Sequence, residues 1–244
     1  MNVGTSLRVK TNEFLGRLGY RVNRLVSQPR DVSDSDWGIF LAVQPYTMTS
    51  PERVLTAIQA ARHITLNRIP GAVVECGVWR GGSSMAIAKT LVAAGDSSRT
   101  IYMYDTYTGM SEPTEKDTDS YGAHASKYMQ KFGETWCASP LDEVRQNMQT
   151  CYPVEQVKFV QGKVEDTIPQ IIPDRIALLR LDTDWYESTA HELKHLWPRL
   201  EPGGVLIIDD YGDWQGARRA VDEFFQGSVF LARVDLTGRV TIKH

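Results

Sequence analysis

Residues 73–83, which read VVECGVWRGGS, join an apolar run to a glycine-rich turn and then to a segment with helical character. The apolar run lacks the regular polar alternation of a half-exposed strand, so it predicts a strand that is buried on both faces. The glycines allow the backbone to turn sharply and to approach a ligand closely. The stretch therefore predicts the strand, ligand-binding turn and helix that open a parallel α/β sheet.

Predicted strands and helices alternate beyond this unit, which is typical of a parallel sheet with right-handed crossovers. The last two predicted strands are separated only by a DLTG turn, which indicates an antiparallel hairpin. We therefore expect an α/β fold with a doubly wound, mostly parallel sheet that ends in an antiparallel C-terminal hairpin. The predicted strands are 73–78, 100–105, 157–160, 176–181, 205–208, 229–234 and 239–242, and the predicted helices are 51–66, 83–94, 141–151, 186–197 and 216–226.

The length of the chain, 244 residues, suits one sizeable α/β domain. Its composition, 42% hydrophobic and 23% charged, is ordinary for a globular protein and excludes the disordered and fibrous classes. The net charge of −3 argues against a nucleic acid as the partner, because phosphate binding needs a basic excess. A small-molecule acceptor is the expected partner.

Residues 1–45 differ in character from the rest of the chain. The first 30 residues contain six basic residues and one acidic residue, and their apolar residues recur at helical spacing. We interpret residues 1–45 as a basic amphipathic N-terminal arm and residues 46–244 as the main domain. The arm is expected to pack on the domain or to be partly ordered; contact with a membrane surface or with a second subunit of a homo-oligomer is the alternative.

The cysteines indicate a reducing compartment. Cys76, Cys137 and Cys151 are odd in number and have no metal-binding spacing, so reduced thiols are expected. No apolar run is long enough for a membrane span, and the N-terminus has no signal-peptide core. We therefore expect a cytoplasmic protein without a membrane span.

Two acidic residues at neighbouring strand ends point to a cofactor. Glu75 would repel a pyrophosphate but can pair with the ammonium group of a methionine moiety. Asp105 ends the next strand, where a carboxylate can accept hydrogen bonds from ribose hydroxyls. The pair favours S-adenosylmethionine over NAD. The other candidate cofactor-binding residues are Gly77, Val78 and Ser83 in the glycine-rich turn, Gly162, Lys163 and Val164 after the third predicted strand, and Asp182 after the fourth.

Four aspartates follow two further strands, in the runs LDTD and IDDY. Like charges brought so close repel each other unless a cation or a proton intervenes. Oxygen ligands without His or Cys suit Mg²⁺, which would acidify an acceptor hydroxyl and hold it in line with the methyl group. We expect Asp182, Asp209 and Asp210 to be the metal ligands, and Asp184 to cap a helix.

The run HELKH, residues 191–195, matches a zinc motif. The apolar residues of the same predicted helix must face the sheet, which turns His191 and His195 toward solvent and away from the strand ends. We therefore expect no zinc site there. The long polar segment 107–133 is instead predicted to be a mobile lid over the ligands.

Several motifs together resemble the macrocin O-methyltransferase (TylF-type) family. They are ECGVWRGG at 75–82, LDTD at 181–184, PRLEPGG at 198–204 and IDDY at 208–211. The resemblance runs from about residue 46 to residue 225. It implies a class I methyltransferase fold, S-adenosylmethionine as cofactor, and hydroxyl groups of sugars or glycosylated natural products as acceptors.

The resemblance also implies roles for individual residues. It implies that Asp182, Asp209 and Asp210 bind Mg²⁺, and that Asp182 accepts the proton of the metal-bound hydroxyl. It also implies that Thr47 and Met48 help to enclose the cofactor. Metal-dependent catechol-type enzymes have a lysine three residues after the first metal aspartate, where this chain has Trp185. A catechol-like mechanism is therefore not expected.

Two other functions remain open from the residues alone. Methylation of a phenolic small molecule would need an aromatic pocket, which the tryptophans and tyrosines near the predicted site could line. A non-catalytic cofactor-binding or assembly protein would rely on the N-terminal arm. The concentrated carboxylates speak against this second alternative, because a protein without catalysis has little use for such charge.

Overall fold

The computed structural model describes residues 27–133 and 135–244. The chain divides into two units, residues 1–34 and 35–244. Most of the predicted N-terminal arm lies outside the described residues. In the first unit, the side chain of Gln28 donates a hydrogen bond to the carbonyl oxygen of Val32, at 2.8 Å.

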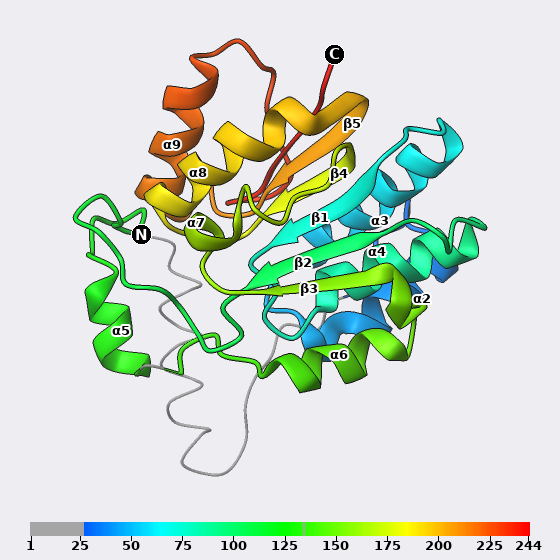
Figure 1. Ribbon diagram of the computed structural model, residues 1–244, viewed down its shortest axis with the longest axis horizontal. Helices are drawn as coiled ribbons and strands as arrows, with labels where there is room; N and C mark the ends of the chain where they lie inside the picture. Colours follow the sequence, from blue (N-terminus) through cyan, green and yellow to red (C-terminus); the bar gives the residue numbers. More distant parts are fainter. Residues whose placement is uncertain (1–26, 134) are drawn as a thin grey trace. The chain divides into compact units, whose positions relative to one another are not determined.

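Seven strands form one sheet in the second unit, in the order β3-β2-β1-β4-β5-β7-β6 (Figure 1). The first five strands in this order are parallel, and β7 and β6 are added antiparallel. The order reverses between β1 and β4, so their carboxyl ends flank the point where open α/β sheets bind ligands. The strands are β1 (Ala72–Cys76), β2 (Ile101–Asp105), β3 (Val157–Gln161), β4 (Ile176–Leu181), β5 (Leu200–Ile208), β6 (Ala232–Arg233) and β7 (Arg239–Ile242).

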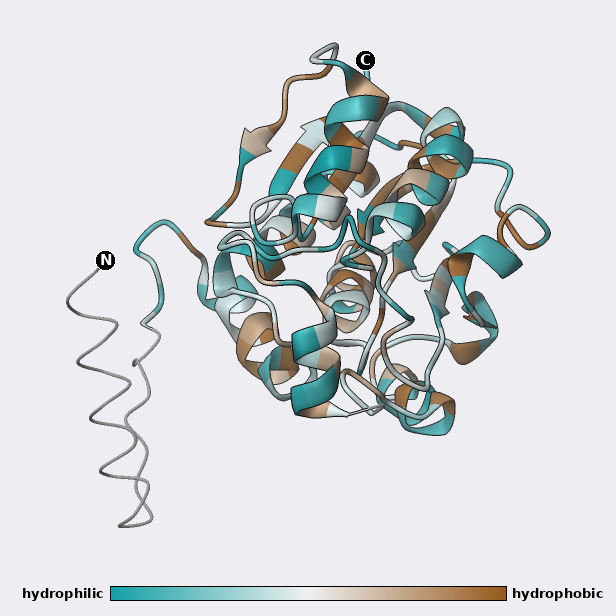
Figure 2. Cartoon of the chain, turned by 90° about the vertical axis from the view of Figure 1, so that its left-hand side faces the viewer, coloured by the Kyte–Doolittle hydropathy of each residue, from teal (hydrophilic) through white to brown (hydrophobic). Residues whose placement is uncertain are grey.

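Helices cover both faces of this sheet. Figure 1 shows α8 and α9 on one face and α3, α4 and α6 on the other. Hydrophobic residues concentrate on the faces that the helices turn toward the sheet (Figure 2), where burial removes apolar surface from water. The α-helices are α2 (Asp34–Val43), α3 (Pro51–Leu66), α4 (Gly82–Ala93), α5 (Ser126–Phe132), α6 (Leu141–Gln149), α7 (Val164–Thr167), α8 (Tyr186–Leu196) and α9 (Gln215–Phe225).

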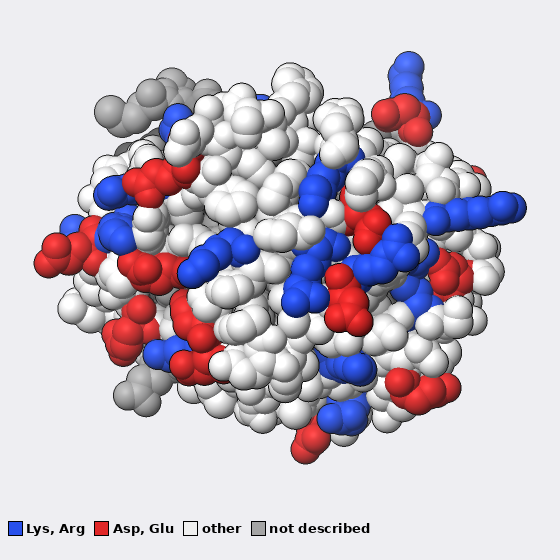
Figure 3. Space-filling model, turned by 45° about the horizontal axis from the view of Figure 1, so that its top comes forward, with Lys and Arg blue, Asp and Glu red and all other residues white. Residues whose placement is uncertain are grey.

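One face of the molecule carries charges of both signs. Acidic and basic side chains are interspersed on the face shown in Figure 3. Within the described ranges, no helix is long and apolar enough to cross a membrane. All three cysteines are free, with Cys76 buried and Cys137 and Cys151 partly buried.

The structure confirms the predicted α/β class, the mostly parallel sheet and the antiparallel end. Two predicted strand bounds were wrong. β5 begins at Leu200, and its pairing with β4 is interrupted at residues 201–204, where Pro202, Gly203 and Gly204 have weak strand propensity, before it resumes at Val205. β6 is only two residues long. Helices α2, α5 and α7 were missed, α2 because it is apolar on most sides and shows little helical periodicity.

The start of α3 brings two polar residues toward the strand ends. The cap of α3 is Ser50, whose side chain accepts a hydrogen bond from the amide of Arg53 at 3.2 Å. The hydroxyl of Thr49 faces both carboxylate oxygens of Asp209, at 3.3 and 3.4 Å. The cap therefore places Thr49 and Arg53 beside the predicted metal site.

Candidate functional site

The glycine-rich turn after β1 is fixed by its backbone. Gly77 has a φ of +81°, and a Cβ there would overlap the carbonyl oxygen of Asp182. The amides of Val78 and Trp79 donate to one carboxylate oxygen of Asp105, at 2.6 and 3.0 Å. The amide of Asp182 donates to the carbonyl of Cys76, at 2.8 Å. The ends of β1, β2 and β4 therefore form one connected backbone unit, which only glycine at position 77 permits.

A small cavity of about 70 Å³ opens beside this unit. It brings together most of the residues that the sequence assigned to the ribose and the adenine, together with part of the segment 107–133. The residues that line it include Gly77, Asp105, Gly162, Lys163, Val164 and Asp182, with Gly109, Met110 and Ser111 on its other side. Ligand sites usually hold about 300 Å³ or more, so a nucleoside fits here only if the segment 109–111 moves.

A larger cavity of about 400 Å³ adjoins the same strand ends. Its lining combines three chemical groups: the predicted cofactor residues Thr47, Met48, Val78 and Ser83; charged residues that include Arg53, Arg180, Asp182, Asp184, Asp209 and Asp210; and the aromatic residues Tyr121, Tyr128, Phe132, Trp136 and Trp214. Asp182 lines both cavities. The two cavities therefore meet at this carboxylate.

Three carboxylates converge in the larger cavity. Asp182, Asp184 and Asp210 each offer an oxygen, and these oxygens all lie within 4.8 Å of one another. Burial raises the pKa of all three, and their mutual repulsion adds to the shift of Asp182 and Asp210; the pKa of Asp184 rises to about 8. An all-oxygen set of this kind fits a hard divalent cation such as Mg²⁺.

Asp184 does not cap a helix, as the sequence had suggested. Helix α8 begins after Trp185 without a side-chain cap from Asp184, and its first amide, that of Tyr186, donates to Asp117 at 2.8 Å. Asp184 has a φ of +67°, a left-handed conformation in which its carboxylate lies with those of Asp182 and Asp210. Asp117, which lies 69 residues before Tyr186, accepts this hydrogen bond instead. Helix-start rules consider only neighbouring residues and cannot identify such a partner.

Asp209 has different surroundings from the other three aspartates. One of its oxygens accepts a hydrogen bond from Arg180 at 2.6 Å, and the other is paired with Arg53. Its side chain is only 4% exposed. The predicted third metal ligand is thus next to the carboxylate group but bonded to two guanidinium groups.

Glu75 also has a partner that the sequence did not suggest. Its carboxylate accepts hydrogen bonds from Arg180, at 2.7 Å, and from the hydroxyl of Ser84. Burial raises the pKa of Glu75, although Arg180 opposes the shift. Among the described residues, those that line the two cavities do not include Glu75. Its pairing with the ammonium group of a cofactor stays a prediction.

The predicted lid bonds the rest of the domain through several residues, among them Ser111, Asp117 and Thr118, and it carries an aromatic surface. Asp117 is fully buried, and its carboxylate accepts hydrogen bonds from Thr114 and from the start of α8. Beyond this anchor, the rings of Tyr128 and Trp136 stack with their centroids 5.9 Å apart, and Trp214 meets Tyr128 edge-on at 5.5 Å. These three aromatic side chains line the larger cavity.

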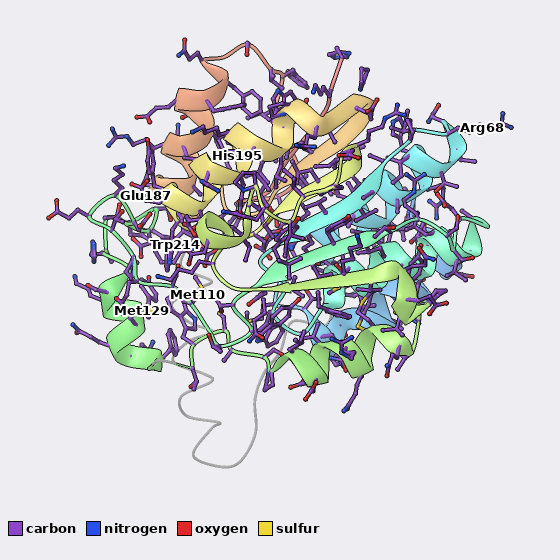
Figure 4. All side chains as sticks on the ribbon, in the orientation of Figure 1. Arg68, Met110, Met129, Glu187, His195 and Trp214 are labelled. Atoms are coloured by element: carbon purple, nitrogen blue, oxygen red, sulfur yellow. The ribbon has the colours of Figure 1, made fainter. Side chains whose placement is uncertain are left out.

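The HELKH run forms no metal group with neighbouring acids in the described part of the chain. Figure 4 shows Glu187 at the beginning of α8 and His195 further along the helix, away from Trp214. Both histidines are only partly exposed, which corrects their predicted solvation, and His191 bonds the carbonyl of Ile168 at 2.8 Å. Glu192 is fully buried and bonds Thr183 at 3.0 Å.

Arg180 and Arg53 were both missed from the sequence. Arg180 interrupts the apolar run of β4. A charged residue inside a buried strand indicates a buried ionic partner, so the sequence did contain a signal for Arg180. Arg53 carries no comparable signal, because it lies in a helix whose sequence mixes polar and apolar residues.

Known proteins are similar to this chain over most of its length. A model of the family described as macrocin-O-methyltransferase (TylF) matches residues 7–238. The 8-demethyl-8-(2,3-dimethoxy-alpha-L-rhamnosyl)-tetracenomycin-C 4'-O-methyltransferase of Streptomyces olivaceus is 37% identical over 167 residues, which are 68% of this chain and 62% of that protein. Mycinamicin III 3''-O-methyltransferase of Micromonospora griseorubida is 32% identical over 181 residues, 73% of this chain and 70% of that protein.

The fold is also similar to a solved structure. The O-methyltransferase NovP superposes with a TM-score of 0.72 and 30% sequence identity, covering 81% of this chain and 82% of NovP. The match to the tetracenomycin enzyme spans less than two thirds of that relative, whereas the family model spans nearly all of this chain. The chain therefore belongs to the macrocin O-methyltransferase (TylF) family, as its motifs predicted.

Proposed function

We propose that this protein transfers the methyl group of S-adenosylmethionine to a hydroxyl group on a sugar or glycosylated natural product, with the help of a divalent cation. The observation that carries the proposal is the position of Asp182, which lines both the cavity beside Asp105 and the acidic, aromatic cavity. A donor in the first cavity and an acceptor in the second would meet at this residue. Family membership supports the same reaction.

The acidic residues would hold Mg²⁺ in this proposal. Asp182 and Asp210 belong both to the predicted ligand set and to the observed group, and Asp184 completes that group in the structure. Asp209, the third predicted ligand, would contribute if its pairing with Arg53 opened. When bound, Mg²⁺ supplies charge that acidifies a hydroxyl and stabilises the developing alkoxide.

Asp182 is our candidate for the residue that takes the proton of the acceptor hydroxyl. Asp184 is the alternative, because its carboxylate lies in the same group as that of Asp182. The pH dependence of the methylation rate distinguishes the two candidate bases. Asp184→Asn would remove an ionisation near neutral pH from the rate profile only if Asp184 is the base.

The aromatic surface would hold the acceptor. Rings such as those of Tyr128 and Trp136 can stack on the apolar face of a sugar ring, and the sugar hydroxyls would face the aspartates. The relatives named above are described as acting on a rhamnosyl tetracenomycin and on mycinamicin III. A phenol could occupy the same surface, so the acceptor class needs a direct test.

The test is an incubation of the purified chain with S-adenosylmethionine and panels of natural-product glycosides and matched phenolic aglycones. Mass spectrometry should find one added methyl group on glycosides, located on the sugar by fragmentation. Methylation of phenols alone would favour the phenolic alternative. Tight binding of S-adenosylhomocysteine without any transfer would favour a non-catalytic cofactor-binding protein.

The organisation and location of the protein form part of the proposal. We propose residues 46–244 as the S-adenosylmethionine-dependent methyltransferase domain, and residues 1–45 as a basic amphipathic N-terminal arm. The free state of the three cysteines supports a reducing, cytoplasmic location.

A further inference from the structure

Arg180 is a buried arginine in the centre of the sheet. Its side chain is 3% exposed, and it stands in register with Glu75 on β1 and with Ile207 on β5. An unpaired charge at such a position would be very costly. The arginine must therefore be balanced by the groups around it.

Three carboxylates from three adjacent strands or strand ends provide that balance. Nη1 of Arg180 lies 2.7 Å from Glu75 and 2.7 Å from Asp182, and Nη2 lies 2.6 Å from Asp209. Each of these aspartates uses one oxygen for the arginine. Because a guanidinium group is planar and presents its donors in a fixed fork, these bonds limit the rotation of both carboxylates.

The three partners differ in what else they contact. Asp182 and Asp209 line the larger cavity, as does Arg180 itself, whereas Glu75 lies behind them and is 1% exposed. Glu75 is held in turn by the hydroxyl of Ser84 on α4. The chain of contacts thus runs from the scaffold, through Glu75 and Arg180, to the two aspartates.

We propose that Arg180 is a positioning residue, and that Glu75 holds it so that Asp182 faces the cation site in a fixed orientation, with Asp209 fixed beside it. This inference rests on the proposed function. It gives Glu75 a task different from pairing with the cofactor, since the carboxylate acts through the arginine. Groups that orient metal ligands usually contribute about 10- to 100-fold to metal affinity or activity.

The charge on Arg180 and the shape of its guanidinium group can be separated. Arg180→Lys keeps the positive charge but replaces two nitrogens by one, so it cannot reach Glu75 and Asp209 with the original geometry. The Coulomb repulsion between this residue and a cation stays about the same. A loss of cation binding in this variant would therefore report the lost orientation of the aspartates.

The experiment measures Mn²⁺ binding by electron paramagnetic resonance and S-adenosylhomocysteine binding by calorimetry, each with the other ligand absent. We expect Arg180→Lys to weaken Mn²⁺ binding by about tenfold or more and to change S-adenosylhomocysteine binding by less than about threefold. The matched control is Arg175→Lys, which breaks a bidentate pair with Glu201 at the surface and should change neither affinity. Equal losses of both affinities in Arg180→Lys would mean that Arg180 only supports the fold.

Glu75→Gln tests the second half of the proposal and stays informative if Arg180→Lys does not fold. We expect it to weaken Mn²⁺ binding by about threefold or more, although Glu75 cannot touch the cation, and to leave S-adenosylhomocysteine affinity within about twofold. Weaker S-adenosylhomocysteine binding with unchanged Mn²⁺ binding would overturn the inference and favour the ammonium pairing instead.

Asp182→Asn separates this inference from the proposed cation site. If it binds Mn²⁺ as well as the unmodified protein, the proposed cation site is wrong. If it loses Mn²⁺ binding while Arg180→Lys and Glu75→Gln keep it, the cation site stands and the positioning role is wrong.

Discussion

The turn after β1 and the loop after β4 lie side by side at the same edge of the sheet, but they are held in different ways. The turn is held by its backbone: Gly77 leaves no room for a side chain, and two amides point at Asp105. The loop is held by charge, with Asp182 bonded to Arg180 and Asp184 grouped with other acids. We expect steric fit to dominate the first arrangement, and protons and cations to affect the second.

This difference indicates how the two halves of the site should respond to change. Substitutions in the turn should act by steric overlap, whatever the solvent. Substitutions in the loop should depend on cation and pH, because the repulsion among its carboxylates is what a cation would relieve.

The largest effect is expected for Gly77→Ala. The new Cβ would overlap the backbone of Asp182, so the free energy of unfolding should fall by about 4 kcal/mol or more. Gly95→Ala is the matched control: its φ of +79° is similar, but nothing lies within 4 Å of a Cβ there. It should lose only about 1 to 2 kcal/mol for its conformation. Similar losses in urea unfolding of both variants would show that overlap with Asp182 is unimportant.

On the charged side, chelation should have the next largest effect. EDTA should abolish methyl transfer and Mg²⁺ should restore it, and Asp182→Asn and Asp209→Asn should each lower kcat by about 10²-fold or more. Asp174→Asn is the control, because that side chain is fully exposed. Steady-state kinetics with an identified acceptor would measure these rates. Full activity in EDTA would contradict the role of a cation.

A smaller loss is expected when Asp105 is replaced by Ala. Charge-assisted hydrogen bonds to ribose would disappear, and so would the acceptor for the amides of Val78 and Trp79. Calorimetry should show S-adenosylhomocysteine binding at about micromolar strength, weakened by roughly 1.5 to 3 kcal/mol in the variant. Binding of NADH in place of S-adenosylhomocysteine would show that the cofactor assignment is wrong.

The pH dependence of stability should distinguish the charged loop from the turn. The folded-state pKa of Asp184, about 8, is higher than that of an unfolded aspartate, so the folded protein holds its proton longer. In EDTA, stability should therefore be highest in acid and fall as pH rises from about 4 toward 8, by about 1 kcal/mol after allowance for solvent screening. Urea unfolding of Asp184→Asn should show a shallower slope; an unchanged slope would rule out this carboxylate as the source.

The smallest expected effect is in the segment 107–133. Hydrogen exchange at Gly109–Ser111 and in α5 should slow on addition of cofactor and acceptor, because the smaller cavity can hold a nucleoside only after this segment moves. Residues around the buried Asp117 should already be protected without ligands. Strong protection of the whole segment in the free protein would show that it is ordinary scaffold.

Much of the fold could be predicted from local patterns. Apolar runs and a glycine-rich turn indicated the parallel sheet, and the DLTG turn indicated the antiparallel end. The positions of Asp105, Asp182 and Asp210 followed because the carboxyl ends of parallel strands always share one edge of the sheet. These features depend on periodicity and chain direction, which neighbouring residues determine.

The tertiary structure alone decided how the charges are paired. Arg180 lies 105 residues from Glu75 along the chain, and Asp117 caps a helix that begins 69 residues later. Asp184 joined the acidic group instead of capping α8, since its left-handed backbone turns it toward Asp210. Such pairs form because a buried charge needs a partner wherever the fold supplies one. No local sequence pattern identifies a partner so far away along the chain, so only the folded structure shows these pairs.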